Sequence, residues 1–409
     1  MAAVVLVGTL DTKGPDFAFL AARLRAAGAE VIVVDVGTGE PAGLTPDIDG
    51  EAVAAAAGTT RAGLRAAADR GLAVAEMGRG AAAVVADLVA RGRVGGVLAA
   101  GGSGGSSIAA QVMAGLPVGL PKLLVSTMAS GDVSPYVGAK DVCVMYSVVD
   151  VAGINRISRL VLGNAAAAMA GMVAAREVQA AQPGADDRPL IAASMFGVTT
   201  PAVEAARARL AGLGYEVLVF HATGAGGRAL EALAGARLVS GVLDLTTTEL
   251  ADDLVGGVLS AGPGRLTAAG AAGVPQVIAP GALDMVNFGP PATVPPRFGG
   301  RLFFEHNPAV TLMRTTAQEM AELGGRIGRK AADATGPAEV FWPERGVSAL
   351  DADGQPFWDP VADAACREAL DRELAAAGRT LRRVDAHIND PAFATAMADR
   401  LHEMITSAR

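Results

Sequence analysis

Short runs of β-branched and other apolar residues alternate with alanine-rich stretches of helical pattern along most of this chain. In the first half the apolar runs lie at residues 4–7, 31–34, 94–99, 122–126 and 142–146. Runs of this length are typical of strands that are buried on both faces of a parallel sheet. Because helical segments separate them, the pattern predicts βαβ units and a doubly wound α/β sheet.

The second half repeats this alternation, and its opening aligns without gaps with the opening of the first half, so that Pro15 meets Pro201 and Gly28 meets Gly214. Any two helix–glycine–strand units share part of this match, because glycine is common just past a helix end. Duplication of a Rossmann-like half accounts for more of the matching positions than this shared preference for glycine. Turn-forming residues separate the halves, so we expect two Rossmann-like domains, residues 1–182 and 189–409. Both should have mostly parallel sheets, with a ligand-binding cleft between the domains.

Composition argues against several classes of protein. The net charge is −8 and the pI is near 5.2, whereas a nucleic-acid-binding surface is basic. No charge-free apolar run approaches the roughly 20 residues of a membrane span. Residues 1–8 have no basic segment, so we expect no signal peptide, and two widely separated cysteines suit a reducing compartment. We expect a cytoplasmic protein with buried thiols that binds neither nucleic acid nor membrane.

The first predicted strand is followed by Gly8-Thr-Leu-Asp-Thr-Lys-Gly14. A strand-to-helix junction of this kind presents free backbone N–H groups and the positive end of a helix dipole, which favour an anion. Lys13 adds a charge suited to phosphate. The alternative is that Asp11 or Thr12 caps the helix. The candidate ligand-binding residues here are Gly8, Thr9, Asp11, Thr12 and Lys13.

The most specific stretch is Gly101-Gly-Ser-Gly-Gly-Ser-Ser107, which follows a predicted strand and begins a helix. Its glycines allow close backbone approach and its serines supply hydroxyls, as phosphate-binding turns require. The spacing is neither the dinucleotide fingerprint nor a Walker A loop, and a tight crossover without a ligand is the alternative. The candidate residues are Gly101, Gly102, Ser103, Gly104, Gly105 and Ser106.

The next predicted strand ends in Ser126-Thr-Met-Ala-Ser-Gly-Asp132, which adds Ser126 and Thr127 to the candidates. Asp132 is a candidate for a metal–phosphate complex or a ribose hydroxyl, with a turn-forming role as the alternative. No histidine or carboxylate spacing indicates a metal cage, so the metal ligands stay unassigned, although Mg²⁺ accompanying a phosphate would be compatible.

The second half carries candidate catalytic groups after two predicted strands. A histidine beside a carboxylate and an amide at a strand end suits general acid–base chemistry, and a hydrogen-bonded structural histidine is the alternative. We expect His306 as the acid or base, oriented by a neighbouring carboxylate or amide, with an arginine on an anionic substrate. The candidate residues are Asp284, Glu305, His306, Asn307 and Arg314.

These motifs together resemble the UPF0261 family, the Tm-1-like ATP-binding-domain proteins. The resemblance is carried by residues 7–14, 101–107, 126–132, 280–288 and 306–316, and covers nearly the whole chain. It implies two Rossmann-like domains, ATP binding in the glycine-rich first domain, and homodimers. Plant members carry a further TIM-barrel-like domain, so a separately encoded barrel partner is conceivable.

The leading hypothesis is a cytoplasmic ATP-binding enzyme of small-molecule metabolism that acts on an anionic substrate in the interdomain cleft. One rival is a non-catalytic, ATP-responsive module that docks a TIM-barrel partner. Another is a lyase or ligase for an anionic metabolite that uses the same loops without ATP. The residues themselves indicate only an anion-binding cleft, and the resemblance supplies the identity of ATP.

Overall fold

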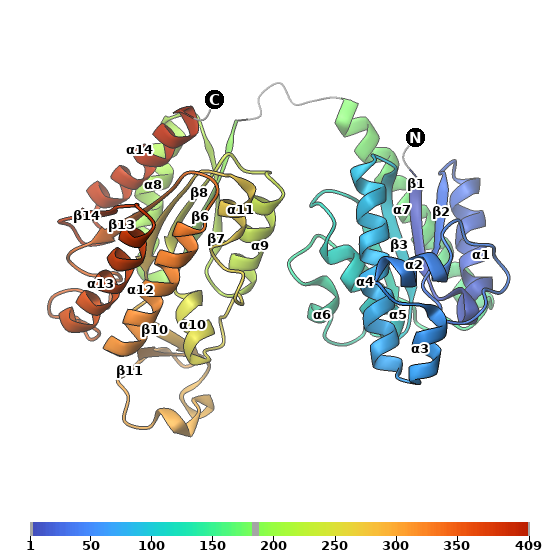
Figure 1. Ribbon diagram of the computed structural model, residues 1–409, viewed down its shortest axis with the longest axis horizontal. Helices are drawn as coiled ribbons and strands as arrows, with labels where there is room; N and C mark the ends of the chain where they lie inside the picture. Colours follow the sequence, from blue (N-terminus) through green and yellow to red (C-terminus); the bar gives the residue numbers. More distant parts are fainter. Residues whose placement is uncertain (1–2, 182–187, 408–409) are drawn as a thin grey trace. The chain divides into compact units, whose positions relative to one another are not determined.

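The computed structural model describes residues 3–181 and 188–407. The chain divides into two compact units, Met1–Ala185 and Asp186–Arg409. Each unit is an α/β fold built on a parallel sheet (Figure 1), which confirms the prediction of Rossmann-like α/β domains. The cleft expected between the units stays a prediction.

The sheet of unit 1 has the strand order β2-β1-β3-β4-β5, and all neighbouring strands are parallel. The strands are β1 (Ala3–Gly8), β2 (Val31–Asp35), β3 (Val94–Gly101), β4 (Lys122–Ser126) and β5 (Cys143–Tyr146). The helices are α1 (Leu10–Ala26), α2 (Gly50–Ala56), α3 (Arg61–Ala67), α4 (Arg70–Ala90), α5 (Ser103–Ala114), α6 (Ser134–Val137) and α7 (Arg156–Ala181).

Alternation along β1 divides the helices of unit 1 between the two faces of the sheet. Val4 and Leu6 pack in one core with side chains of α1 and α7. Val5 and Val7 pack in the other with side chains of α2, α4 and α5. The helix that follows β1 and the helix that follows β3 therefore leave the sheet on opposite faces. Because β1 and β3 are neighbours, their carboxyl ends form the topological switch point at which such sheets bind ligands.

Unit 2 has the strand order β14-β13-β9-β8-β6-β7, again parallel throughout. The strands are β6 (Leu190–Met195), β7 (Glu216–His221), β8 (Gly241–Thr246), β9 (Gln276–Gly281), β13 (Ala338–Pro343) and β14 (Leu381–Val384). The helices are α8 (Thr200–Gly212), α9 (Ala225–Gly235), α10 (Glu249–Val255), α11 (Ala268–Ala272), α12 (Ala317–Ala332), α13 (Pro360–Ala376) and α14 (Pro391–Ser407). Short 3₁₀ turns lie at η1 (Gly197–Thr199), η2 (Pro291–Thr293) and η3 (Pro296–Phe298).

A small antiparallel sheet extends unit 2, in the order β10-β12-β11. Its strands are β10 (Met285–Phe288), β11 (Phe303–Asn307) and β12 (Val310–Arg314). The sequence pattern predicts a strand over residues 302–304 and a loop after it. The strand is confirmed at residues 303–304, and the loop is wrong, because β11 continues to Asn307 and forms a hairpin with β12. Asn307 accepts the Ala309 N–H at 2.9 Å, and Pro308 between them cannot continue the hydrogen-bonded ladder.

Helix α7 meets the length and composition of a membrane-spanning helix over Arg156–Gln179. The charged residues of this segment are confined to its ends, which leaves a long apolar middle. Leu162, Ala165 and Met169 of this helix are buried against the sheet of unit 1. A helix that packs on a protein core meets the same criterion, so this single helix is weak support for a membrane span.

The two cysteines differ in their surroundings. Cys366 on α13 is buried, and burial raises the pKa of its thiol, as an inert thiol requires. Cys143 is exposed, so the expectation of burial is wrong there. It begins β5, an edge strand whose residues are all at least partly exposed.

A buried ion network holds the carboxyl end of β8 in unit 2. Arg265 is fully buried, and its guanidinium bonds Asp244, Glu249 at 2.6 Å and Glu231 at 3.1 Å. The Glu249 carboxylate also accepts the N–H groups of Gly224 and Gly227, at 2.7 and 3.0 Å. These contacts satisfy the guanidinium with internal carboxylates, so Arg265 is a structural residue.

Arg265→Met should lower the free energy of unfolding by about 3–5 kcal/mol, because it leaves buried carboxylates without their cation. Chemical denaturation followed by circular dichroism measures this. The matched control is Arg345→Met, which removes the exposed Arg345–Asp385 pair and should lower the free energy of unfolding far less, because solvent screens an exposed pair. Equal losses in the two variants would contradict a structural role for the network.

Candidate functional site

A pocket of about 670 Å³ lies at the switch point of unit 1. Its lining comes from the residues after β1 and β2, the first turns of α4, Gly102 with the first turns of α5, and the residues after β4 and β5. The volume falls within the roughly 300–1,000 Å³ that is usual for small-molecule sites. The structure thus places candidates from three separate motifs on one pocket, namely Thr9, Asp11, Thr12, Lys13, Gly102, Ser103, Gly104, Gly105 and Thr127.

The loop after β1 is shaped by a kink in the first turns of α1. Lys13 has non-helical angles (φ −127°, ψ 16°), and Pro15 follows two residues later. A proline inside a helix removes a backbone hydrogen bond and clashes with the preceding turn, which accounts for the kink. The Thr12 hydroxyl lies 3.1 Å from the Thr9 hydroxyl. Because of the kink, Thr9, Thr12 and Lys13 all line the pocket instead of pointing in the different directions that a regular helix would give them.

The glycine loop begins α5 without a side-chain cap. Gly102 occupies the N-cap position, and no side chain accepts the first N–H groups of the helix. In the same unit, α2, α3 and α4 are capped by Asp49, Thr60 and Asp69. The first turn of α5 lines the pocket, so its backbone N–H groups are the ones available to an anion.

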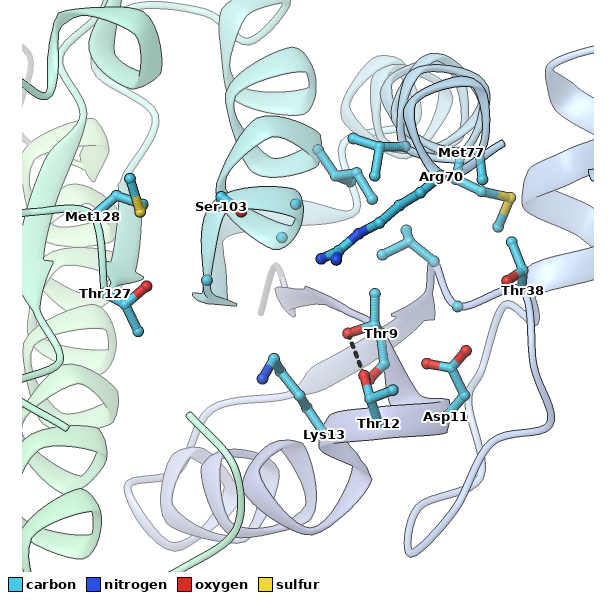
Figure 2. A pocket seen from close by; sticks show the side chains of 18 of the residues that line it. Thr9, Asp11, Thr12, Lys13, Thr38, Arg70, Met77, Ser103, Thr127 and Met128 are labelled. Carbon is cyan, nitrogen blue, oxygen red and sulfur yellow. Dashed lines mark hydrogen bonds between the residues drawn. The ribbon is translucent and has the colours of Figure 1, made fainter. Parts of the chain in front are cut away.

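Two cations point into this pocket. Figure 2 shows Arg70 extending from α4 toward Ser103 and Thr9, and Lys13 extending toward the same space. The Lys13 ammonium donates to the backbone carbonyl of Val151. Neither Lys13 nor Arg70 forms an ion pair (N···O within 4.0 Å) with any residue in the described ranges. Two cations without ion pairs beside a helix N-terminus favour an anion.

Two carboxylates also line the pocket, Asp11 and Asp150. Asp11 Oδ2 accepts the Gly39 N–H at 2.9 Å, and its buried Oδ1 has no partner among the described residues. Behind it, Asp35 accepts the N–H groups of Leu10 and Gly37 and so ties the loop to β2. Burial raises the pKa of Asp35 despite these bonds.

Other predicted ligand-binding residues support the loops from behind. A Cβ at Gly8 would lie 1.9 Å from the Phe17 ring, so this glycine is required for packing. At Gly102 the nearest heavy atom would be 3.6 Å away, which leaves space toward a ligand. Ser106 and Ser126 are buried and bond each other at 2.7 Å. Gly8, Gly101, Ser106 and Ser126 lie outside the lining, whereas Gly102 belongs to it.

Asp132 also lies outside the pocket lining. It is exposed, and its carboxylate accepts the Ser134 N–H at 2.9 Å at the start of α6. Hydrogen bonds from the Ser134 hydroxyl and from this N–H lower its pKa. These are the contacts of a turn-forming aspartate. Asp11 and Asp150 are the carboxylates that the structure places where Asp132 was expected.

The sequence analysis missed Arg70 and Asp150. Both line the pocket. Arg70 begins α4, which follows another helix, and Asp150 follows β5 by four residues in a segment without a glycine-rich motif. The packing of α4 and the path of the chain after β5 bring them to the switch point. Arg70 does follow Asp69, an N-cap residue, which places it on the first turn of a helix.

The structure separates the candidate catalytic residues of unit 2 into two groups. Arg314 ends β12 and pairs with Met285, next to Asp284, whereas Glu305 pairs with Thr311 near the hairpin turn. Three to four residues of strand separate the groups, about 10–14 Å at ~3.4 Å per residue. Glu305, His306 and Asn307 are exposed. His306 therefore does not lie beside Asp284 or Arg314.

The buried group is an internal network. Arg314 donates to Asp363 at 3.1 Å, to the Phe357 carbonyl at 2.7 Å and to the Thr315 hydroxyl at 2.9 Å. Asp284 accepts the Ser348 hydroxyl at 2.8 Å. The guanidinium is occupied by protein groups, which disfavours the predicted role in binding an anionic substrate.

Carboxylates crowd around this arginine. Burial, reinforced by the charge of Asp351, raises the pKa of Asp284 to about 7. Burial and the same neighbour raise the pKa of Asp363 to about 8. Among the described residues no group of three or more histidine, cysteine or carboxylate side chains is arranged to hold a metal ion.

Comparisons with known proteins match both units to one family. Residues 2–178 match the N-terminal domain, and residues 188–405 the C-terminal domain, of the uncharacterised protein family UPF0261. A UPF0261 protein of Clostridium tetani is 48% identical over 402 residues, which cover 98% of each chain. A UPF0261 protein of Rhizobium meliloti is 49% identical over 397 residues, or 97% of each chain.

The ToMV resistance protein Tm-1(GCR237) of Solanum lycopersicum is 40% identical over 423 residues. The match covers 99% of this chain and 56% of the tomato protein. The chain thus spans about half the length of this plant relative, whereas it spans nearly all of the two bacterial relatives.

Asp284→Asn should change the pH dependence of stability. The folded-state pKa of Asp284 is raised above the unfolded value, so the folded state binds this proton more tightly, and the wild type loses stability as pH rises from about 4 to about 7. Denaturation at pH 4.5 and pH 8 should show the variant gaining, relative to wild type, on the order of 2 kcal/mol over this interval.

The control for this experiment is Asp385→Asn. Arg345 lowers the pKa of this exposed carboxyl. Removal of the carboxyl should therefore change the pH dependence of the free energy of unfolding only weakly, and in the direction opposite to Asp284→Asn. If the free energies of unfolding of wild type and Asp284→Asn differed by the same amount at both pH values, this result would contradict a raised pKa of Asp284.

Proposed function

The chain belongs to the UPF0261 family, and we propose that its first unit is a nucleotide-binding module whose pocket takes the phosphates of ATP. The observation that carries this proposal is the pair of cations, Lys13 and Arg70, which form no ion pair within the described ranges and point into one pocket. A protein that keeps two such charges over a helix N-terminus has a site complementary to a polyanion.

The residues of the pocket fit the parts of a nucleotide. Backbone N–H groups at the start of α5, with the Ser103 and Thr12 hydroxyls, suit phosphate oxygens. Val74, Met77, Ile108 and Met128 form an apolar part of the lining that suits a base. Asp11 and Asp150 are the carboxylates that would hold Mg²⁺, which usually binds one or two carboxylates together with the phosphates of its substrate.

A binding role needs fewer assumptions than a catalytic one. The acid–base set proposed from sequence is divided between the exposed end of a hairpin and a buried network, as described for His306 and Arg314. If the protein is an enzyme, groups already on the pocket, such as Asp11, are closer to the bound phosphates. Turnover of ATP by the purified protein would establish the catalytic role.

The wider expectations belong to the same proposal. They are a cytoplasmic location, a homodimer, an anionic co-substrate and a separately encoded TIM-barrel partner. The name of the tomato relative states resistance to ToMV, and that property is ascribed to that protein alone.

Lys13→Met and Arg70→Met should each weaken ATP binding at least tenfold, about 1.4 kcal/mol, because each removes a cation from the phosphates. Ser103→Ala should weaken binding less, because it removes only a neutral hydrogen bond. Isothermal titration with ATP, with and without Mg²⁺ and beside ADP and NADH, measures these changes.

The matched control is Arg79→Met, a loss of charge on the same helix as Arg70. Arg79 is exposed, pairs with Glu76 and does not line the pocket, so ATP affinity should stay within about twofold. ATP binding that survives unchanged in the Lys13, Arg70 and Ser103 variants would place the nucleotide elsewhere, and no binding in the wild type would refute the proposal.

A further inference from the structure

A second pocket lies in unit 2, between β11 and the segment that joins β10 to β11. Its volume is about 400 Å³. Figure 1 shows this segment projecting from the small antiparallel sheet. The apolar walls are Pro291, Val294, Pro295, Pro296, Phe298 and Phe303. Prolines carry no N–H donor and little rotamer freedom, so the walls are apolar and stiff.

The register of the hairpin puts two polar groups on this apolar surface. Glu305 of β11 lies opposite Thr311 of β12, and Phe303 lies opposite Met313. Residues two apart on a strand share a face. Glu305, Thr311 and Phe303 therefore face the proline segment together, with Thr311 on the central strand and Glu305 on the edge strand.

The hydroxyl of Thr311 is a buried group without a partner. Thr311 is 4% exposed, and its Oγ1 makes no hydrogen bond with the described residues. Burying a hydroxyl without a partner is unfavourable, and valine would fill the same space without that cost. Its oxygen has almost no accessible surface in the free protein, so a ligand in the pocket reaches this unpartnered hydroxyl when the lining side chains shift.

The carboxylate of Glu305 is exposed and forms no ion pair within the described ranges. The pocket therefore has an uncompensated negative charge at its rim. The aromatic rings add to the attraction for a cation. Arg297 lies over the Phe298 ring at 4.6 Å from its centre, which shows that this ring accepts a cation on one face.

We propose that this pocket binds a small organic amine with an apolar body. The Glu305 carboxylate bonds the ammonium, the Thr311 hydroxyl supplies a hydrogen bond at the floor, and the prolines with Phe298 and Phe303 cover the body of the ligand. The site lies wholly in unit 2 and is separate from the nucleotide site proposed in unit 1, so either can fail without the other.

The test uses the full chain and three probes of similar size, namely benzylamine, benzyl alcohol and benzoate. Saturation-transfer NMR titrations at neutral pH should give millimolar affinity for benzylamine and at least tenfold weaker binding of benzoate. Glu305→Gln should abolish the preference for the amine over the alcohol. Glu216→Gln, at an exposed glutamate on the edge strand β7, should leave it unchanged.

Thr311→Val separates a ligand-binding role from a structural one. The variant should bind benzylamine more weakly and yet have an unchanged or higher Tm, because the hydroxyl has no partner in the free protein. A lower Tm would show that the hydroxyl stabilises the fold and would overturn its assignment to a ligand.

Three other outcomes would overturn the proposal. They are no binding of benzylamine, equal binding of benzylamine and benzoate, and amine binding that Glu305→Gln leaves intact. A second copy of the chain seated in the pocket would make the apparent affinity for benzylamine fall as protein concentration rises, and that result would also overturn it.

Discussion

The change of helix direction between β1 and β3 is the constraint on which the site of unit 1 depends. Parallel neighbours end at the same edge of a sheet, and here the helices that follow them leave on opposite faces. No connection then crosses the gap between the two strand ends. The first turns of α1 and α5 meet at this gap, and the N–H groups at the start of α5 have no side-chain cap there. The hydroxyls, the cations and the carboxylates of the pocket are additions to a crevice that topology already provides.

In unit 2 the helices that follow the neighbouring strands β6 and β8 also pack into different cores, but the polar residues at these strand ends bond to one another. Its strand ends are joined by buried hydrogen bonds, Ser194 to Asp244 at 2.7 Å and Thr199 to Thr246 at 2.8 Å. Arg265 then neutralises Asp244 from within the protein. The polar residues that follow β1 face a pocket, and those that follow β8 face one another. A glycine- or hydroxyl-rich strand end is therefore not sufficient to indicate a ligand site.

The sequence could predict what depends on local pattern. The apolar runs gave the parallel strands of both units, the five motifs gave the family, and the glycine loop was correctly placed between a strand and a helix. Arg70 could not be found, because its place on the pocket depends on how α4 packs. The grouping of His306 with Arg314 failed because a hairpin separates residues that are close in sequence. Asp132 makes the contacts of a turn-forming residue, which was the alternative to a role in binding metal or ribose.

The bond between the Lys13 ammonium and the Val151 carbonyl has a consequence for binding. An ammonium has three donors, so this bond leaves others for an anion. The side chain is held in place before any ligand arrives, and the rotamer entropy that a free lysine would lose on binding is already lost in folding. Lys13 is thus a preorganised donor, and it links whatever occupies the pocket to the segment that leads into α7.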